Sequence, residues 1–157
     1  MSAVPDLIGR YAAGPDELVK LVATLPDGSV DYRPAPGKWT IREILVHLAE
    51  AEAVGFTRIR RAIAEPGSAV FAYDQDAWAR EADYAHQDIN LALTLFNALR
   101  DSTVEVLKSL PAEAFSRTIE HPERGTMTLT AVLDLYIRHV TVHLSQIRRN
   151  LDSFSTR

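Results

Sequence analysis

The sequence predicts an all-α protein, a four-helix bundle with long crossover connections. Four stretches of about 20 residues place apolar side chains every three or four positions, which is the spacing of amphipathic helices. Strand signals are poor, because no alternating apolar run is bounded by hairpin turns. Two connections also run to about 20 residues, whereas simple up-and-down bundles have short loops. We therefore expect at least one overhand crossover.

Three of the four helices are predicted from apolar periodicity, over about residues 3–25, 88–110 and 128–151. Within the first, Gly14–Pro15 threatens a kink or a break, because proline lacks a backbone donor and clashes with the preceding turn. The segment FAYDQDAWAREADYAH, which precedes the third helix, is ambiguous. An aspartate within it could cap a short helix.

The second helix in the chain has the clearest start signal. Thr40 and Glu43 have the spacing of a capping box, in which each side chain bonds the other residue's backbone. Trp39 and Ile44 stand at the two positions of a hydrophobic staple. The apolar stripe then continues until Pro66, which is followed by glycine and ends the helix.

The composition fits one globular domain over residues 1–157. Hydrophobic residues make up 46% of the chain, charged residues 24%, and the formal net charge is −4. This charge argues against a nucleic-acid partner, because such proteins normally present a basic face. The N-terminus lacks the pattern of a signal peptide, and no apolar stretch approaches the roughly 20 residues of a membrane span. We therefore expect a cytoplasmic protein without a membrane partner.

The chain contains no cysteine. This excludes disulfides, thiolate metal sites and a cysteine nucleophile, so any metal must bind histidine, aspartate or glutamate. A glycine-rich phosphate loop and a G-x-S-x-G nucleophile elbow are also missing. The histidines are therefore the residues that most favour a chemical role.

His139 and His143 lie four residues apart in the last predicted helix, so both point to the same side of it. Both fall on its apolar stripe, since Val132 precedes His139 by seven residues and Tyr136 precedes His143 by seven. In the second helix, His47 lies on the flank of the apolar stripe. The three histidines thus face, or nearly face, the interior of the bundle.

The levels of these histidines favour one helix arrangement. His47 lies about 11 Å from the start of its helix, and the midpoint of the pair lies about 15 Å from the end of theirs. The two levels nearly coincide if the second and fourth helices are antiparallel, whereas parallel helices would separate them by about 9 Å. Two interpretations stay open at this point. The imidazoles either bind one metal ion or are polar side chains that bond their neighbours.

The type and number of ligands indicate which metal would bind and what kind of site it would form. Three neutral imidazoles suit zinc, nickel, copper or iron better than magnesium or calcium. Three protein ligands leave a coordination position for water or a substrate, which is typical of catalytic rather than structural sites.

Three segments resemble the DinB/YfiT-like family: GKWTIREILVHLAEAE, FAYDQDAWAR and GTMTLTAVLDLYIRHVTVHLSQI. Together they cover nearly all of the chain beyond its first helix. The resemblance implies a four-helix bundle, often dimeric, with parallel middle helices and antiparallel second and fourth helices. It also implies that His47, His139 and His143 bind a divalent metal, commonly nickel or zinc. One departure is Leu144, where many members carry a further histidine.

Other residues have both a functional and a structural interpretation. Gln146, one turn beyond His143, could orient that imidazole or a metal-bound water, or could lie at the surface. Glu50 could bond a ligand imidazole or act as a base, or could be a solvated charge. Tyr73 and Trp78 could cover the metal pocket from the crossover, or could pack against the bundle.

Two functions from different classes follow. The first is a metal-dependent enzyme that acts on a small-molecule substrate with a low-molecular-weight thiol, as some relatives do as S-transferases or isomerases. The second is a non-enzymatic metal-binding bundle, and an empty, vestigial site is a third possibility. The catalytic residues beyond the ligands are unknown. His86 and His121 fall outside the motif, and we expect His121 to be exposed in a loop.

Overall fold

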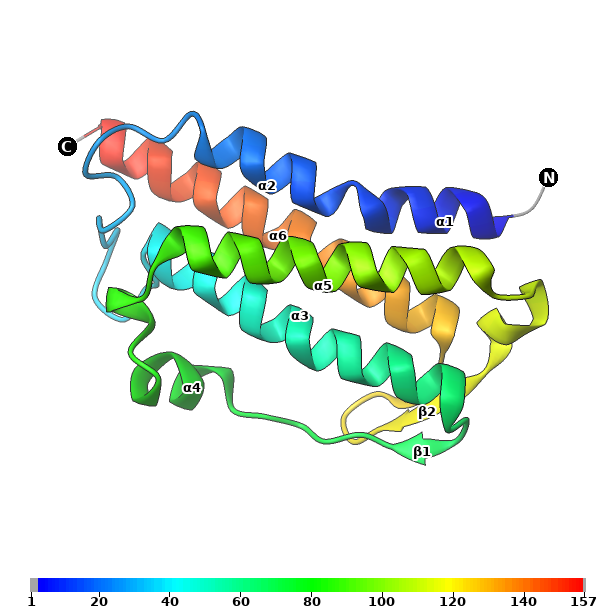
Figure 1. The fold of residues 1–157 in the computed structure, drawn as a ribbon. Coiled ribbons are helices and arrows are strands. Elements are labelled where there is room, and N and C mark those ends of the chain that lie inside the picture. The colour runs from blue at the N-terminus through cyan, green and yellow to red at the C-terminus, as the bar shows by residue number, and fades with distance from the viewer. Residues whose placement is uncertain (1–2, 157) are drawn as a thin grey trace.

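The computed structural model describes residues 3–156, in which four helical columns pack side by side (Figure 1). The columns are α1 (Ala3–Ala12) followed by α2 (Gly14–Val22), then α3 (Ile41–Ala64), α5 (Ile89–Ser109) and α6 (Leu129–Ser155). α3 and α5 run in one direction, and α6 and the first column run in the other. The predicted bundle with antiparallel second and fourth helices is confirmed. Residues 1, 2 and 157 of the predicted domain lie outside the described part.

The connection from α3 to α5 returns along the whole bundle, because these two helices are parallel. It contains β1 (Ser68–Ala69), α4 (Gln75–Glu81) and the 3-10 turn η1 (Tyr84–His86). Asp74 caps α4 by accepting hydrogen bonds from the backbone N–H groups of Asp76 and Ala77. This connection is the expected overhand crossover, and it contains the expected short helix.

A three-stranded sheet lies at one end of the bundle, in segments whose strand signals are poor (Figure 1). The connection from α5 to α6 contains the 3-10 turn η2 (Ala112–Ser116), β2 (Thr118–His121) and β3 (Gly125–Thr128). β2 pairs antiparallel with β3 and parallel with β1. Strands of two to four residues are too short to display apolar alternation. The sheet joins the two long connections beside the end of α3.

The break in the first column occurs at the predicted Gly–Pro pair. Pro15 cannot donate a hydrogen bond to the carbonyl of Tyr11, four residues earlier. The buried Arg100 of α5 donates to that carbonyl instead, from Nη1 at 2.7 Å, and from Nη2 to the carbonyl of Tyr136 at 3.0 Å. Its charge is balanced by Glu52 of α3 at 2.9 Å. Removing one partner of such a buried pair costs about 3–5 kcal/mol, so this contact fixes four helices relative to one another.

The start of α3 is fixed by the predicted capping box. The Thr40 hydroxyl accepts from the Glu43 N–H at 3.2 Å, and the Glu43 carboxylate accepts from the Thr40 N–H at 2.6 Å. Trp39 and Ile44 belong to one apolar cluster, as expected for a staple. Because the helix start is fixed, so is the level at which His47 faces α6.

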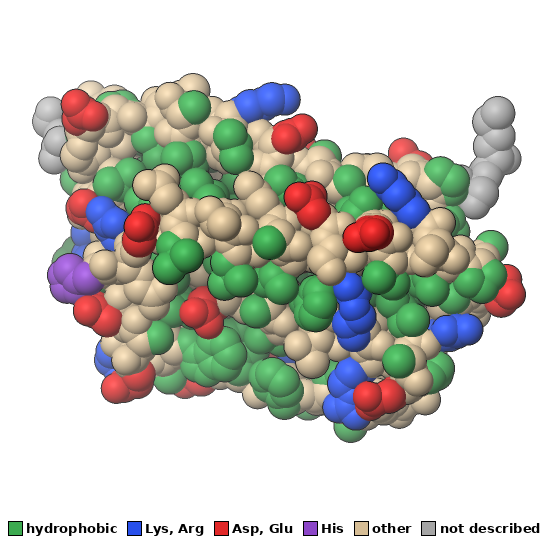
Figure 2. All heavy atoms as spheres, viewed as in Figure 1, with side chains coloured by type: hydrophobic (Ala, Val, Ile, Leu, Met, Phe, Trp, Pro, Cys, Tyr) green, Lys and Arg blue, Asp and Glu red, His purple; other side chains and the backbone are tan. Residues whose placement is uncertain are grey.

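The face seen in Figure 2 carries charged side chains of both signs, scattered among hydrophobic ones. Beneath the surface, two apolar clusters fill the bundle, one towards the sheet and one around the start of α3. Within the described residues, no helix is both long and apolar enough to cross a membrane.

Candidate metal centre and its pocket

Three imidazoles converge between α3 and α6. The Nε2 atom of His139 lies 3.0 Å from Nε2 of His47 and 3.1 Å from Nε2 of His143. The ring nitrogens that the three residues offer lie within 4.8 Å of one another. His47 is buried, with 1% of its surface exposed, and the other two are half-buried. The antiparallel helices therefore bring the three predicted residues together.

Burial keeps these imidazoles neutral. It lowers the pKa of His47 to about 3, with a smaller effect from the charge of His143. It lowers the pKa of His139 to about 2, with further contributions from the two other imidazoles and from Arg100. The pKa of His143 is also lowered by burial, although its hydrogen bond with Gln146 opposes the shift. Neutral imidazole is the form that binds metals.

The contacts around the cluster fit a cation better than they fit hydrogen bonding alone. Gln146 Oε1 lies 2.9 Å from His143 Nδ1, so a neutral His143 carries its proton there and presents a lone pair at Nε2. His139 Nε2 can donate one proton, to His143 or to His47, but not to both. At most one of the two nitrogen–nitrogen contacts can therefore be a hydrogen bond in any neutral arrangement. A cation among the three nitrogens would use all three lone pairs.

The spacing of the nitrogens is also close to that of a transition-metal site. Two nitrogens bound to zinc at about 2.05 Å with tetrahedral angles lie about 3.3 Å apart. The two observed separations are 3.0 and 3.1 Å. The residues present therefore fit a divalent metal with small adjustments of side-chain rotamers.

The predicted neighbours of the cluster differ in their contacts. Gln146 orients His143 through the hydrogen bond just described. Glu50 is half-buried and makes no hydrogen bond to any of the three imidazoles within the described residues. Its charge instead acts with burial to raise the pKa values of Tyr73 and Tyr84. Leu144 is buried in the apolar cluster around the start of α3.

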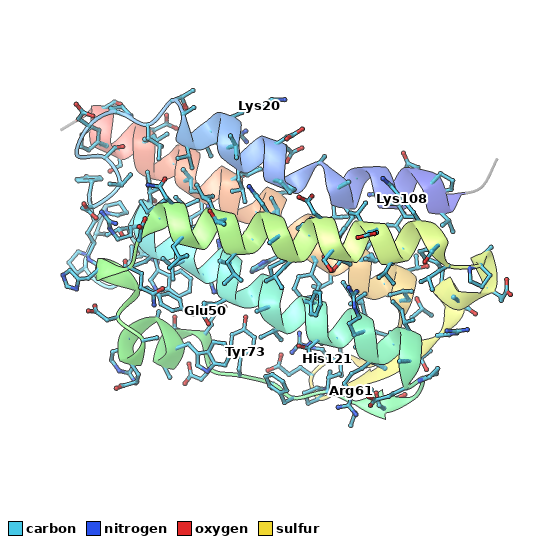
Figure 3. The ribbon with its side chains drawn as sticks, in the orientation of Figure 1. Lys20, Glu50, Arg61, Tyr73, Lys108 and His121 are labelled. Carbon is cyan, nitrogen blue, oxygen red and sulfur yellow. The ribbon has the colours of Figure 1, made fainter. Side chains whose placement is uncertain are left out.

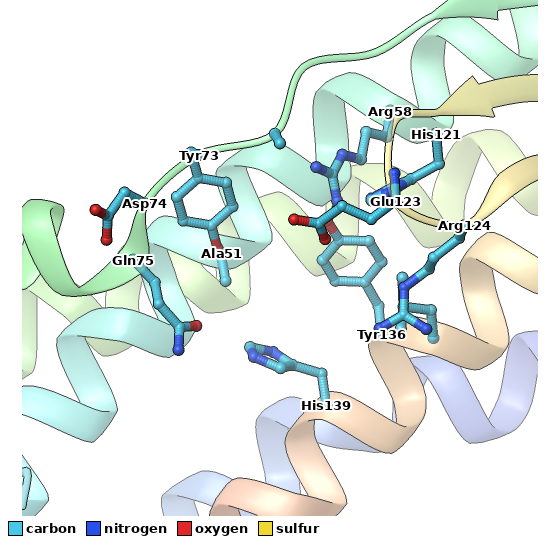
Figure 4. Close-up of a pocket in the computed structure, with 12 residues that line it drawn as sticks. Ala51, Arg58, Tyr73, Asp74, Gln75, His121, Glu123, Arg124, Tyr136 and His139 are labelled. Carbon is cyan, nitrogen blue, oxygen red and sulfur yellow. The ribbon is translucent and has the colours of Figure 1, made fainter.

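A pocket of about 420 Å³ opens beside the cluster (Figure 4). His139 points into it from α6, and Tyr73, Asp74 and Gln75 flank it from the crossover. Arg58, from α3, and residues of the β2–β3 turn flank its other side. One of the three clustered histidines therefore faces a space large enough for a small molecule.

The two aromatic residues predicted to cover the pocket have separate positions. Tyr73 lies between α3 and the crossover and lines the pocket (Figure 3). Trp78 does not line it but packs against the bundle, with its ring 4.6 Å from that of Tyr73. Tyr73 thus covers the pocket directly, and Trp78 supports it from behind.

A family model described as the DinB superfamily matches residues 10–147. The chain belongs to the DinB superfamily. Curated relatives of this DinB-like protein include a Bacillus cereus protein named "Putative metal-dependent hydrolase" and a Bacillus thuringiensis protein with the same description. Each is 28% identical over 141 residues, covering 88% of this chain and 81% of the relative. Together with the histidine cluster, this kinship supports a metal-binding protein.

Solved structures agree with the fold. Bacillus subtilis YfiT, described as "a probable metal-dependent hydrolase with an unusual four-helix bundle topology", matches with a TM-score of 0.89 and 25% identity, covering 99% of this chain and 90% of that one. A mycothiol-dependent maleylpyruvate isomerase matches with a TM-score of 0.71 and 12% identity, covering 92% of this chain and 60% of that one. The second likeness concerns the fold alone.

Several pocket residues of this DinB-like protein were missed by sequence reasoning. His121 was expected to be exposed, but it is 6% exposed at the end of β2 and lines the pocket. Its burial depends on the sheet, for which the sequence has no local signal. Arg58 could have been found, because it follows His47 by eleven residues, about three helical turns, and so shares its face of α3.

Proposed function

We propose that this protein is a metal-dependent enzyme whose ligands are His47, His139 and His143. The observation that carries the proposal is the convergence of three neutral imidazoles beside a pocket into which one of them points. The metal proposed is nickel or zinc, because imidazole donors favour both. The proposed substrates are small molecules, with a low-molecular-weight thiol as co-substrate.

In this proposal, residues of the chain hold the metal and enclose the substrate. The three histidines hold a divalent cation with a position left for a substrate, and Gln146 fixes the ring orientation of His143. Tyr73 and Tyr136 enclose the small molecule beside His139. A bound metal supplies Lewis acidity, which lowers the pKa of a coordinating thiol or water.

Thiol transfer is the first reaction to test. Protein loaded with nickel or zinc is mixed with 1-chloro-2,4-dinitrobenzene and, in turn, glutathione, cysteine, mycothiol and bacillithiol. A carbon–sulfur bond forms as chloride leaves, and the coloured product is followed by absorbance. We expect a rate that depends on one thiol and exceeds that of the His47→Ala variant. Equal rates for the two proteins with every thiol would contradict thiol transfer to this electrophile.

Hydrolysis is a second candidate, favoured by the names of the curated relatives. The same loaded protein is assayed with ester and amide substrates in the absence of thiol. Turnover that needs metal but no thiol would favour hydrolysis over transfer. Metal binding without turnover in either assay would favour the non-enzymatic metal-binding bundle.

Assembly is a separate proposal. We infer a homodimer from the family resemblance, and sedimentation equilibrium of the purified chain tests it. A mass twice that of the 17.4 kDa chain is expected, whereas a single-chain mass at micromolar concentration would contradict it.

A further inference from the structure

We propose that the pocket beside the histidine cluster binds the carboxylate of a small organic acid, and that Arg58 is the residue that recognises it. The proposal rests on the proposed function in so far as the same pocket is taken to hold the substrate. It adds the chemical class of that substrate and the residue that selects it.

Arg58 is a buried cation without an anionic partner. Only 7% of its surface is exposed, and no carboxylate of the described residues lies within 4.0 Å of its guanidinium. The buried Arg100 differs, because Glu52 balances its charge. Burying an unpaired charge is costly, and buried charges are normally paired, so a buried guanidinium that lacks a carboxylate is a candidate site for an anionic ligand.

The hydrogen bonds of Arg58 hold it in place and leave donors over. Nη2 donates to the carbonyl of Phe71 in the crossover at 2.8 Å, and Nη1 donates to the Tyr136 hydroxyl at 3.3 Å. Both acceptors are neutral. Nε is buried without a partner, and the guanidinium has five N–H groups in all. The planar group is thus oriented and still able to donate to an oxyanion.

The surroundings of Arg58 favour a carboxylate attached to an apolar body. Ala51, Leu135 and the rings of Tyr73 and Tyr136 line the same pocket and offer apolar contact. The guanidinium fork matches the two oxygens of a carboxylate.

His121 and the rim charges set how much negative charge the pocket can take. His121 Nδ1 accepts from the backbone N–H of Glu123 at 3.2 Å, which leaves an N–H at Nε2 to donate. Burial and the charges of Arg58 and Arg124 lower the pKa of His121 and keep it neutral. The exposed rim carries two carboxylates, Glu123 and Asp74, and one cation, Arg124, and its net negative charge opposes a ligand of higher negative charge, such as phosphate. One buried cation therefore matches one negative charge.

Benzoate and benzamide form the matched probe pair, since they differ chiefly in charge. Their binding to the full-length protein is measured by calorimetry, first as purified and then after a chelator has removed metal. We expect benzoate to bind at least about tenfold more tightly than benzamide in both preparations, as for a charge-assisted hydrogen bond. Equal affinities would overturn the proposal. A preference that disappears on chelation would overturn the role of Arg58 and leave the metal proposal standing. If the protein never binds metal but still prefers benzoate, the role of Arg58 stands and the metal proposal is wrong.

Variants then assign the preference to a residue. Arg58→Gln should weaken benzoate binding about tenfold and leave benzamide unchanged. Arg61→Gln is the matched control, because Arg61 also lies on α3 and also donates to a crossover carbonyl, that of Ala69, but does not line the pocket. It should leave both affinities unchanged. Loss of the preference in Arg124→Gln but not in Arg58→Gln would overturn the assignment to Arg58.

If Arg58→Gln does not fold, nitrogen-15 NMR of the unmodified protein tests whether Arg58 contacts benzoate. The Arg58 Nε–H signal should shift with benzoate and stay in place with benzamide. If benzoate leaves it unmoved while Glu123→Gln moves it, Glu123 neutralises Arg58 and the proposal is wrong. Inorganic phosphate serves as a competitor, and tighter binding of phosphate than of benzoate would overturn the choice of a carboxylate.

Discussion

Burial keeps His47, His139 and His143 neutral, and this lowers the stability of the metal-free protein at acidic pH. Each has a folded-state pKa below the unfolded value of about 6.5, with His47 at about 3 and His139 at about 2. Between these values the unfolded chain binds more protons than the folded protein. The free energy of unfolding is therefore unaffected by these groups above about pH 6.5 and falls as the pH drops towards 3.

We predict that the metal-free protein is less stable at pH 5.0 than at pH 7.5, with His47 and His139 each contributing up to about 2 kcal/mol of the loss and His143 adding to it. Urea unfolding of chelator-treated protein at the two pH values measures it. His139→Gln should show a smaller loss than the unmodified chain. His86→Ala should not, because His86 is exposed and bonds only Asp83. An identical pH dependence in all three proteins would contradict the assigned pKa shifts.

Among single residues, the three histidines could be predicted from the sequence, whereas the roles of Arg58 and His121 could not. The histidines could be predicted because helical spacing shows which face of a helix a side chain occupies. Its position along the helix axis follows from the residue number. Arg58 obeys the same rule, but its significance is that no carboxylate of the described residues pairs with it, which only the packed structure reveals. His121 is buried by strand pairing between two connections far apart in the sequence.

At the scale of elements, α3 packs closely against Tyr136 of α6 at Gly55. A Cβ atom at this position would lie 2.5 Å from a ring carbon of Tyr136. Glycine is thus required by the contact between the two helices that carry the histidines. The same ring bonds Arg58 through its hydroxyl, so this contact also shapes the pocket.

We predict opposite effects for alanine at two helical glycines. Gly55→Ala should destabilise the protein, because about 1–3 kcal/mol of overpacking against Tyr136 exceeds the ~1 kcal/mol gained in helix propensity. Gly9→Ala, in α1, should stabilise by about 0.5–1 kcal/mol, since its Cβ would meet nothing within 4 Å. Urea unfolding at pH 7.5 measures both. Stabilisation by Gly55→Ala would show that the helices separate without cost.

The helices were predictable for reasons that the strands do not share. Long amphipathic stretches, the Thr40 capping box and the break before Pro15 are local signals, and each appears in the structure at its predicted place. The sheet depends on the pairing of Ser68 with Ile119 across fifty residues, which no local pattern encodes. The C-terminal helix also extends to Ser155, four residues beyond the prediction, with a weakening apolar stripe.

In the molecule as a whole, folding and metal binding depend on different residues. Two apolar clusters and the buried pair of Glu52 and Arg100 hold the bundle together independently of the histidines. The histidines lie between α3 and α6, where, without a cation, at most one of the two nitrogen–nitrogen contacts can be a hydrogen bond. Loss of a ligand should therefore cost metal and leave the helices intact.

Metal content per chain, measured by elemental analysis of freshly purified untagged protein, shows whether His47, His139 and His143 form one metal site. We predict that His47→Ala, His139→Ala and His143→Ala each lose most of the bound metal, because two imidazoles hold a divalent ion far less well than three. His86→Ala and His121→Ala should lose none, and far-UV circular dichroism should show the same helical signal in all five variants. If the His47→Ala protein keeps its full metal content, α3 and α6 do not share a metal site, and the proposed three-histidine ligand set is wrong.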